Sequence, residues 1–258
     1  MDLHTVETFR AAGADLSLAP GETWVAGGTW LFSEPQPGVR GMVDLTALGW
    51  PAWEGRPTGV TIGATCTIAE LVAHAEASAL PALAVTRSCA ESLVMSTKIW
   101  GAATVGGNVC LALPAGAMTS LLAGLGATAV VRGTAGERRE PVAELVRGVR
   151  RTSLGSGEVV RSFEIDHDVL ARPAAFRRFA LTDMGRSGGV VIGRPVGDRV
   201  VVTITGATRR PWVLDVDRGS VDGALDRIDP WYDDPHGAPD WRRAQTRRCV
   251  HEILEELS

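Results

Sequence analysis

Cysteine is scarce in this chain, and the spacing of the few that exist excludes clustered metal ligands. Cys66, Cys89, Cys110 and Cys249 stand far apart, and no CxxC pair occurs. Zinc sites and iron–sulfur clusters need several thiolate or imidazole ligands at short spacings. The five histidines are equally scattered. We therefore expect no zinc site or iron–sulfur cluster in this chain, and we interpret the cysteines as buried free thiols.

Lysine and long apolar runs are also nearly missing. Lys98 is the only lysine, so arginine supplies the remaining positive charge, and the net charge is −4. This balance gives no reason to expect nucleic acid as a partner. The apolar stretches are interrupted well short of a membrane span. Residues 1–5 lack the basic region and apolar core of a secretion signal, so we expect a cytoplasmic protein with no integral membrane segment.

Two glycine-rich segments are the most informative feature that is present. Ala26-Gly27-Gly28-Thr29 lies within Trp24–Leu31, and Thr104-Val105-Gly106-Gly107-Asn108 is followed shortly by Leu113–Gly116. A backbone without Cβ atoms bends sharply and aims N–H groups at an anion. Neither segment matches GxGxxG or GxxxxGK[ST], which disfavours a Rossmann site and a P-loop. Together they suggest that separate parts of the chain bind one phosphate-bearing ligand.

The order of apolar patterns predicts an α+β chain in three units. Residues 1 to about 53 are expected to form strand, helix, strand and turn. In the second unit Thr67-Ile68-Ala69-Glu70 forms a capping box that predicts a helix to about Ser78. The other expected elements are strands at 59–64, 128–131, 176–181 and 199–204, and helices at 81–94, 118–125 and 239–257.

Several blocks of the chain, taken in order, resemble the FAD-binding medium subunits of molybdenum hydroxylases. This family includes the subunits of carbon monoxide dehydrogenase, xanthine dehydrogenase and bacterial aldehyde or N-heterocycle dehydrogenases. The resemblance runs almost end to end. It is carried by Ala26–Thr29, Val43–Thr46, Ile62–Ile68, Ala103–Asn108 with Pro114–Gly116, and Leu154–Val160.

The resemblance implies an FAD-binding fold of the vanillyl-alcohol-oxidase/PCMH type. Its FAD-binding domain would cover residues 1–165, as subdomains of about 1–53 and 54–165, and a C-terminal α+β flavoprotein domain would cover 166–258. The backbone of the first glycine segment would wrap the FAD pyrophosphate, and the second would close on it. The implied contacts are Val25, Ala26, Gly27, Gly28, Thr29, Trp30, Leu31, Thr104, Gly106, Gly107 and Asn108.

Two further residues follow from the resemblance. Val160 falls where the family places an apolar residue near the flavin. Arg177 falls where relatives carry a basic residue near the flavin ring, although a solvated strand arginine is an equal alternative. We also expect that a side chain at Gly107 would push the backbone from the phosphates or strain a positive φ. No residue is expected to act as a general acid, base or nucleophile.

The implied function is electron transfer in a multi-subunit, molybdopterin-dependent dehydrogenase. FAD would bind this chain, whereas molybdopterin would bind a large partner subunit and 2Fe-2S clusters a small one. Electrons would pass from those clusters to NAD⁺, a quinone, oxygen or another acceptor. Two alternatives stay open. One is a stand-alone flavin oxidase. The other is a non-catalytic assembly subunit that has lost FAD, suggested by Ala117 where relatives often carry an acidic residue.

Overall fold

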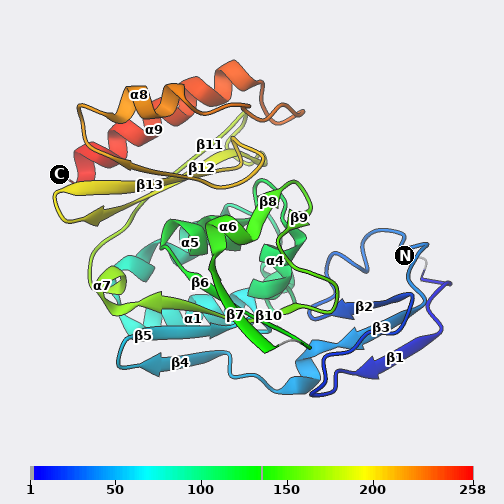
Figure 1. The fold of residues 1–258 in the computed structure, drawn as a ribbon. Helices are drawn as coiled ribbons and strands as arrows, with labels where there is room; N and C mark the ends of the chain where they lie inside the picture. The colour runs from blue at the N-terminus through cyan, green and yellow to red at the C-terminus, as the bar shows by residue number, and fades with distance from the viewer. Residues whose placement is uncertain (1–2, 135, 258) are drawn as a thin grey trace.

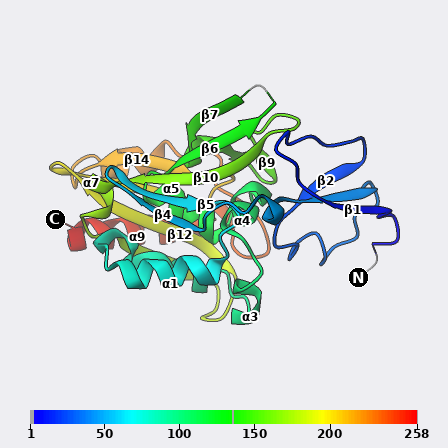
Figure 2. The same ribbon diagram turned by 90° about the horizontal axis from the view of Figure 1, so that it is seen from below.

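Three larger sheets follow one another along the chain in the computed structural model, which describes residues 3–134 and 136–257 (Figure 1). The first is a parallel sheet with the strand order β1-β3-β2. Its strands are β1 (Thr8–Ala11), β2 (Glu22–Val25) and β3 (Gly41–Asp44), and the short 3-10 helix η1 (Leu45–Leu48) follows. In Figure 2 this sheet lies beside the rest of the molecule, next to α4 (Val105–Leu111).

The prediction of a helix between the first two strands is wrong, because residues 3–53 of the described chain contain no α-helix. The connection between β1 and β2 carries Gly13, Pro20 and Gly21, and Leu16 adopts a φ of +49°. Glycine and proline disfavour a helix interior, and a left-handed residue interrupts the ladder of helical hydrogen bonds. The segment therefore forms turns.

The second sheet is antiparallel and has five strands in the order β4-β5-β10-β6-β7. Helices pack on one face of it and bury Val60, Ile62 and Phe163. The strands are β4 (Trp53–Arg56), β5 (Gly59–Gly63), β6 (Thr128–Gly133), β7 (Gly136–Pro141) and β10 (Val159–Asp166). The larger helical elements are α1 (Ile68–Ser78), η2 (Pro81–Val85), α2 (Thr86–Glu91), α4 and α5 (Ala117–Gly124).

The predicted capping box is confirmed at the start of α1. The Thr67 hydroxyl accepts from the Glu70 N–H at 3.2 Å, and the Glu70 carboxylate accepts from the Thr67 N–H at 2.8 Å. Shorter elements complete this part of the chain. They are α3 (Thr97–Trp100), α6 (Val142–Leu145), β8 (Val146–Gly148), β9 (Arg151–Thr152) and α7 (His167–Leu170).

The third sheet is an antiparallel meander whose two faces pack against different partners. It consists of β11 (Ala175–Ala180), β12 (Ser187–Val196), β13 (Arg199–Thr205) and β14 (Trp212–Val216). Successive strand residues face opposite sides. Ile192 accordingly joins the core of the second unit beside α5, whereas Val191 joins the core under α8 (Val221–Asp226) and α9 (Pro239–Leu257).

Helix α9 has the predicted bounds, and its residues Val250, Ile253 and Leu254 are buried. The α+β fold class is confirmed. The division into domains of residues 1–165 and 166–258 stays a prediction. β10 is the last strand along the chain that belongs to the second sheet, and β11 is the first strand of the third sheet. No helix within the described ranges 3–134 and 136–257 is long and apolar enough to cross a membrane.

Candidate cofactor site

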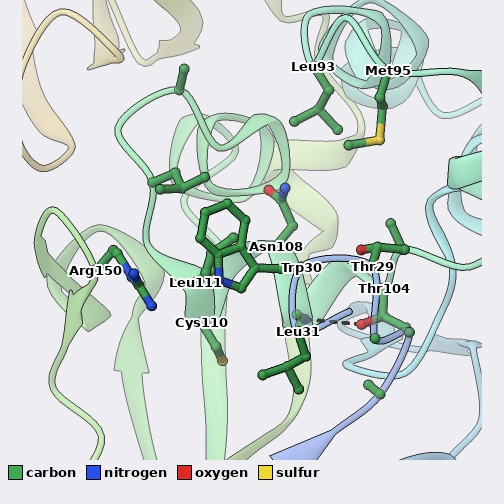
Figure 3. A pocket seen from close by; sticks show the side chains of 18 of the residues that line it. Thr29, Trp30, Leu31, Leu93, Met95, Thr104, Asn108, Cys110, Leu111 and Arg150 are labelled. Atoms are coloured by element: carbon green, nitrogen blue, oxygen red, sulfur yellow. Dashed lines mark hydrogen bonds between the residues drawn. The ribbon is translucent and has the colours of Figure 1, made fainter. Parts of the chain in front are cut away.

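A cavity of about 870 Å³ opens where the three units meet. Its wall takes residues from 26–31 after β2 and from 104–111 around α4 (Figure 3). The 232–236 loop before α9 also contributes to the wall. Sites for small molecules and cofactors have volumes of roughly 300–1,000 Å³ and are often found between domains. The cavity therefore has the size and position of a cofactor site.

The first glycine segment presents a run of unused N–H groups along this wall. Phe32 N–H donates to Gly28 O at 2.8 Å, and Ser33 N–H donates to Trp30 O at 2.9 Å. The N–H groups of Gly27–Leu31, in contrast, have no hydrogen-bond partner within the part of the chain that the structure describes. Such a run resembles the open first turn of a helix, which is suited to an anion.

Glycine is required at both positions of this segment, for different reasons. A Cβ at Gly27 would lie 2.8 Å from the Ala102 carbonyl carbon and closer still to its oxygen. Gly28 has a φ of +67°, and a Cβ there would meet the Phe32 ring at 2.8 Å or less. Gly27 thus permits direct contact with the Ala102–Ala103 backbone, and Gly28 permits the bend itself.

The second glycine segment is not a free turn, because it forms the beginning of α4. Thr104 is the N-cap, and its hydroxyl accepts from the Gly107 N–H at 3.1 Å. Val105 N–H donates to Cys66 O and Gly106 N–H to Ala64 O, each at 2.8 Å. The expected second run of free N–H groups is therefore absent here.

What the second segment gives to the cavity wall is bare backbone and the Thr104 hydroxyl. Gly107 has helical backbone geometry, so the expected positive φ is not found at this position. A Cβ at Gly106 would lie 2.6 Å from the Ala64 Cβ, which explains that glycine by packing. Asn108 also lines the cavity, although its carboxamide oxygen accepts from the Met118 N–H at 2.9 Å.

The structure brings most of the sequence-predicted positions together in one wall. The positions that line the cavity are Ala26, Gly27, Gly28, Thr29, Trp30, Leu31, Thr104, Gly106, Gly107, Asn108 and Val160. Val25 is buried at the end of β2, behind the turn. Ala117 is fully buried in α5 and does not belong to the wall.

Arg177 is the predicted position that the structure places elsewhere. It lies on β11, and its guanidinium pairs with Glu252 at 2.9 Å and with Glu256 at 2.7 Å. Both carboxylates belong to α9, on the side of the sheet opposite α5. The side chain therefore joins the meander to its covering helix and does not line the cavity.

Sequence reasoning missed the wall that the C-terminal unit supplies. Arg186, Ser187, Tyr232, Asp234 and His236 line the cavity from this side. No short-range pattern could have placed them there, because their position depends on how the meander packs against α5.

The buried guanidinium of Arg242 fixes the loop that carries three of these residues. It donates to the Gly206 carbonyl at 2.6 Å, to the Gly237 carbonyl at 2.8 Å and to the Asp234 carboxylate. Arg242 is 1% exposed and also lies against Tyr232, 5.5 Å from the ring centroid. The 232–236 loop is therefore held at the cavity by α9 and by the end of β13.

Other wall residues gave no distinctive sequence signal. Leu93 and Met95 line one side, and Arg150 lies over the Trp30 ring at 5.4 Å from its centroid (Figure 3). Two titratable wall residues are perturbed. Two hydrogen bonds from Arg138, at 2.7 and 2.8 Å, hold the pKa of Glu158 at about 2. Burial raises the pKa of Cys110 to about 12, so this thiol is not a nucleophile at neutral pH.

The described residues form no group of three or more His, Cys, Asp or Glu side chains able to hold a metal ion. The cavity wall combines backbone amide donors, hydroxyl groups such as that of Thr104, small residues and apolar side chains.

Solved structures with the same fold cover nearly the whole chain. Carbon monoxide dehydrogenase from Oligotropha carboxidovorans matches with a TM-score of 0.82 over 97% of this chain and 96% of that chain, at 19% identity. Quinoline 2-oxidoreductase from Pseudomonas putida 86 matches with a TM-score of 0.77 over 96% and 95%, also at 19% identity. At this identity the likeness shows the fold.

Sequence comparison gives the family. Nicotinate hydroxylase of Emericella nidulans is 26% identical over 166 residues, which are 58% of this chain and 12% of that protein. Residues 2–167 match the model of the FAD-binding domain in molybdopterin dehydrogenase. This chain therefore belongs to the family of FAD-binding domains of molybdopterin dehydrogenases.

Proposed function

We propose that this chain is the FAD-binding electron-transfer subunit of a molybdopterin-dependent dehydrogenase, and that the 870 Å³ cavity holds the FAD. The observation that carries the proposal is the run of free N–H groups at Gly27–Leu31 along the cavity wall. A pyrophosphate is doubly charged, and fixed amide dipoles match it without the cost of burying a second charge. Membership of a family of FAD-binding domains identifies FAD as the cofactor that contains this pyrophosphate.

The residues present fit FAD. The Gly27–Leu31 amides would hold the pyrophosphate, and the Thr104 hydroxyl has a proton left to donate after accepting from Gly107. Gly106 and Gly107 keep the neighbouring part of the wall free of side chains. Apolar wall residues such as Val160 and Leu154 suit the flat, largely apolar flavin ring.

The role proposed for the protein is to bind and orient FAD, which supplies the redox chemistry that amino-acid side chains lack. Electrons would enter from 2Fe-2S clusters in a small partner subunit after substrate oxidation at molybdopterin in a large one. They would leave to an external acceptor. The wide spacing of the four cysteines supports a division of labour in which the clusters belong to another polypeptide. Cytoplasmic location stays a prediction.

The alternative of an assembly subunit that has lost FAD is disfavoured by the wall itself. A site released from its ligand would be free to fill with side chains. Here the cavity is open, and the N–H groups of Gly27–Leu31 along its wall have no partner within the described chain. Ala117, which suggested the loss, lies outside that wall.

The direct test is the cofactor content of the full chain. Denaturing the purified protein should release intact FAD, because no covalent attachment is expected. Protein that stays colourless after incubation with excess FAD would contradict the proposal.

The test for the electron-transfer role is co-expression with the neighbouring genes of its operon or cluster. We expect a hetero-oligomer that contains iron, sulfide and molybdenum, and whose flavin is bleached by substrate. The isolated chain should show no substrate-dependent bleaching. Bleaching of the isolated chain by an organic substrate would favour the stand-alone oxidase instead.

A further inference from the structure

Arg150 is a cation of the cavity wall that has no acidic partner among the described residues. It lies in the turn between β8 and β9, where its N–H donates to the Ala112 carbonyl at 2.8 Å. Its guanidinium lies over the Trp30 ring, 5.4 Å from the centroid. Within residues 3–134 and 136–257 it forms no ion pair, although arginine pairs are frequent in this chain.

The other charges of the wall are neutralised or lie on the C-terminal side. Glu158 is paired with Arg138, and Asp234 is paired with Arg242. Arg186 also has no ion pair in the described chain, but it belongs to the C-terminal unit. The next residue, Ser187, donates its hydroxyl to Ser92 O at 2.9 Å. Of these two arginines, Arg150 is the one whose guanidinium lies over a side chain of the Gly27–Leu31 turn, that of Trp30.

The backbone of Arg150 is also unusual. Its φ is +53°, in the left-handed region where glycine or asparagine is normally found. A long side chain at such a position is unfavourable for the backbone. Arg150 is the second residue of the two-residue turn between β8 and β9, and such turns often need a positive φ. Glycine would adopt this conformation more easily, so the turn itself does not require an arginine here.

We propose that Arg150, held over Trp30, binds a phosphate of the FAD pyrophosphate and makes the cavity selective for FAD over flavins that lack phosphate. A guanidinium presents paired N–H donors that match phosphate oxygens, and its flat face stacks on an aromatic ring. Trp30 belongs to the turn with the free N–H groups, and Arg150 lines the same cavity as this turn. This inference rests on the proposed FAD site.

The experiment compares flavin binding by the flavin-free full chain and its variants. Quenching of flavin fluorescence gives the dissociation constants for FAD and for riboflavin, which has no phosphate. We expect Arg150→Ala to weaken FAD binding about tenfold, the order expected for one charge-assisted hydrogen bond at an exposed site, and to leave riboflavin binding unchanged. Added salt should weaken FAD binding less in this variant than in the wild type.

Arg151→Ala is the matched control, because Arg151 is the exposed neighbour, forms no ion pair with the described residues and does not line the cavity. Its FAD affinity should equal that of the wild type. Equal losses for FAD and riboflavin in Arg150→Ala, or no loss for FAD, would overturn the proposal. Wild-type protein that binds no flavin at all would instead refute the FAD site itself.

Arg150→Gly separates binding from folding. Glycine accepts a φ of +53° without a steric penalty, so this variant should unfold at or above the wild-type temperature. It should nevertheless lose the same factor in FAD affinity as Arg150→Ala. If Arg150→Gly binds FAD as tightly as the wild type, the guanidinium does not contact the phosphate.

Discussion

Replacing Gly27 by alanine tests whether the first glycine turn is pressed against the rest of the cavity wall. The new Cβ would lie 2.8 Å from the Ala102 carbonyl carbon and 3.2 Å from the Ala103 Cα, whereas ordinary contacts begin near 3.4 Å. The obstacle is backbone, so no side chain can rotate away. Overpacking of this kind costs about 1–3 kcal/mol of folding free energy. The turn must therefore move away from Ala102–Ala103 and from Thr104, which follows them.

Two measurements follow from this displacement. The melting temperature should fall, by roughly 2–4 °C per kcal/mol for a chain of this size. FAD affinity should fall by at least about tenfold, since about 1.4 kcal/mol of lost contact is sufficient. Gly38→Ala is the control, because Gly38 lies in the same unit and a Cβ added there would have no atom within 4 Å. Wild-type melting in Gly27→Ala would refute the close contact, and lower melting with unchanged FAD affinity would remove the turn from the cofactor site.

Two further predictions concern single side chains of the wall. Thr104→Val removes the N-cap of α4, so it should lower the folding stability by about 1 kcal/mol and weaken FAD binding about tenfold. Thr104→Ser should keep both the stability, measured by thermal unfolding, and the affinity, measured by FAD titration. A serine variant as weak as valine would contradict the hydroxyl's role. The depressed pKa of Glu158 stabilises the fold above its unfolded value of 4.5, and this contribution disappears as the pH falls toward about 2. Glu158→Gln should therefore be less stable than the wild type at pH 7 but not near pH 2. Glu54→Gln is the control, because Glu54 is exposed and has no ion pair in the described chain, and it should match the wild type at both pH values. A pH-independent loss of stability in Glu158→Gln would argue against the Arg138 pair.

Local sequence signals were sufficient where the structure depends on neighbouring residues. The Thr67–Glu70 capping box and the apolar stripe of α9 each act within a few residues, and both were predicted correctly. The order of the sequence blocks likewise identified the family, because it reflects a complete fold and not one turn.

The second glycine segment was misread because its structure depends on distant partners. Gly106 and Gly107 disfavour a helix by intrinsic propensity, which favours the prediction of a turn. The helix forms because Thr104 caps it and because the segment after β5 supplies acceptors at Ala64 and Cys66. Backbone acceptors carry no residue-type signature, so the sequence could not reveal them.

The glycines of β12 concealed a strand for a similar reason. Gly188 and Gly189 weaken any strand prediction. In the fold each lies under a large aromatic ring, since Cβ atoms there would meet Trp241 at 2.9 Å and Phe179 at 2.7 Å or closer. The glycines make room for side chains that are distant in sequence, and only the tertiary structure shows this.

The proposed site also depends on residues that the family match does not reach. The match ends at residue 167, but the cavity wall continues through Arg186, Tyr232 and His236. Arg242 fixes this last wall, because its buried guanidinium joins the loop carboxylate of Asp234 to carbonyls at the end of β13 and before α9. A buried charge that loses its partners is strongly destabilising, so the loop and the meander form one structural unit. The cavity is therefore complete only when all three units are present, and the C-terminal unit contributes to it directly.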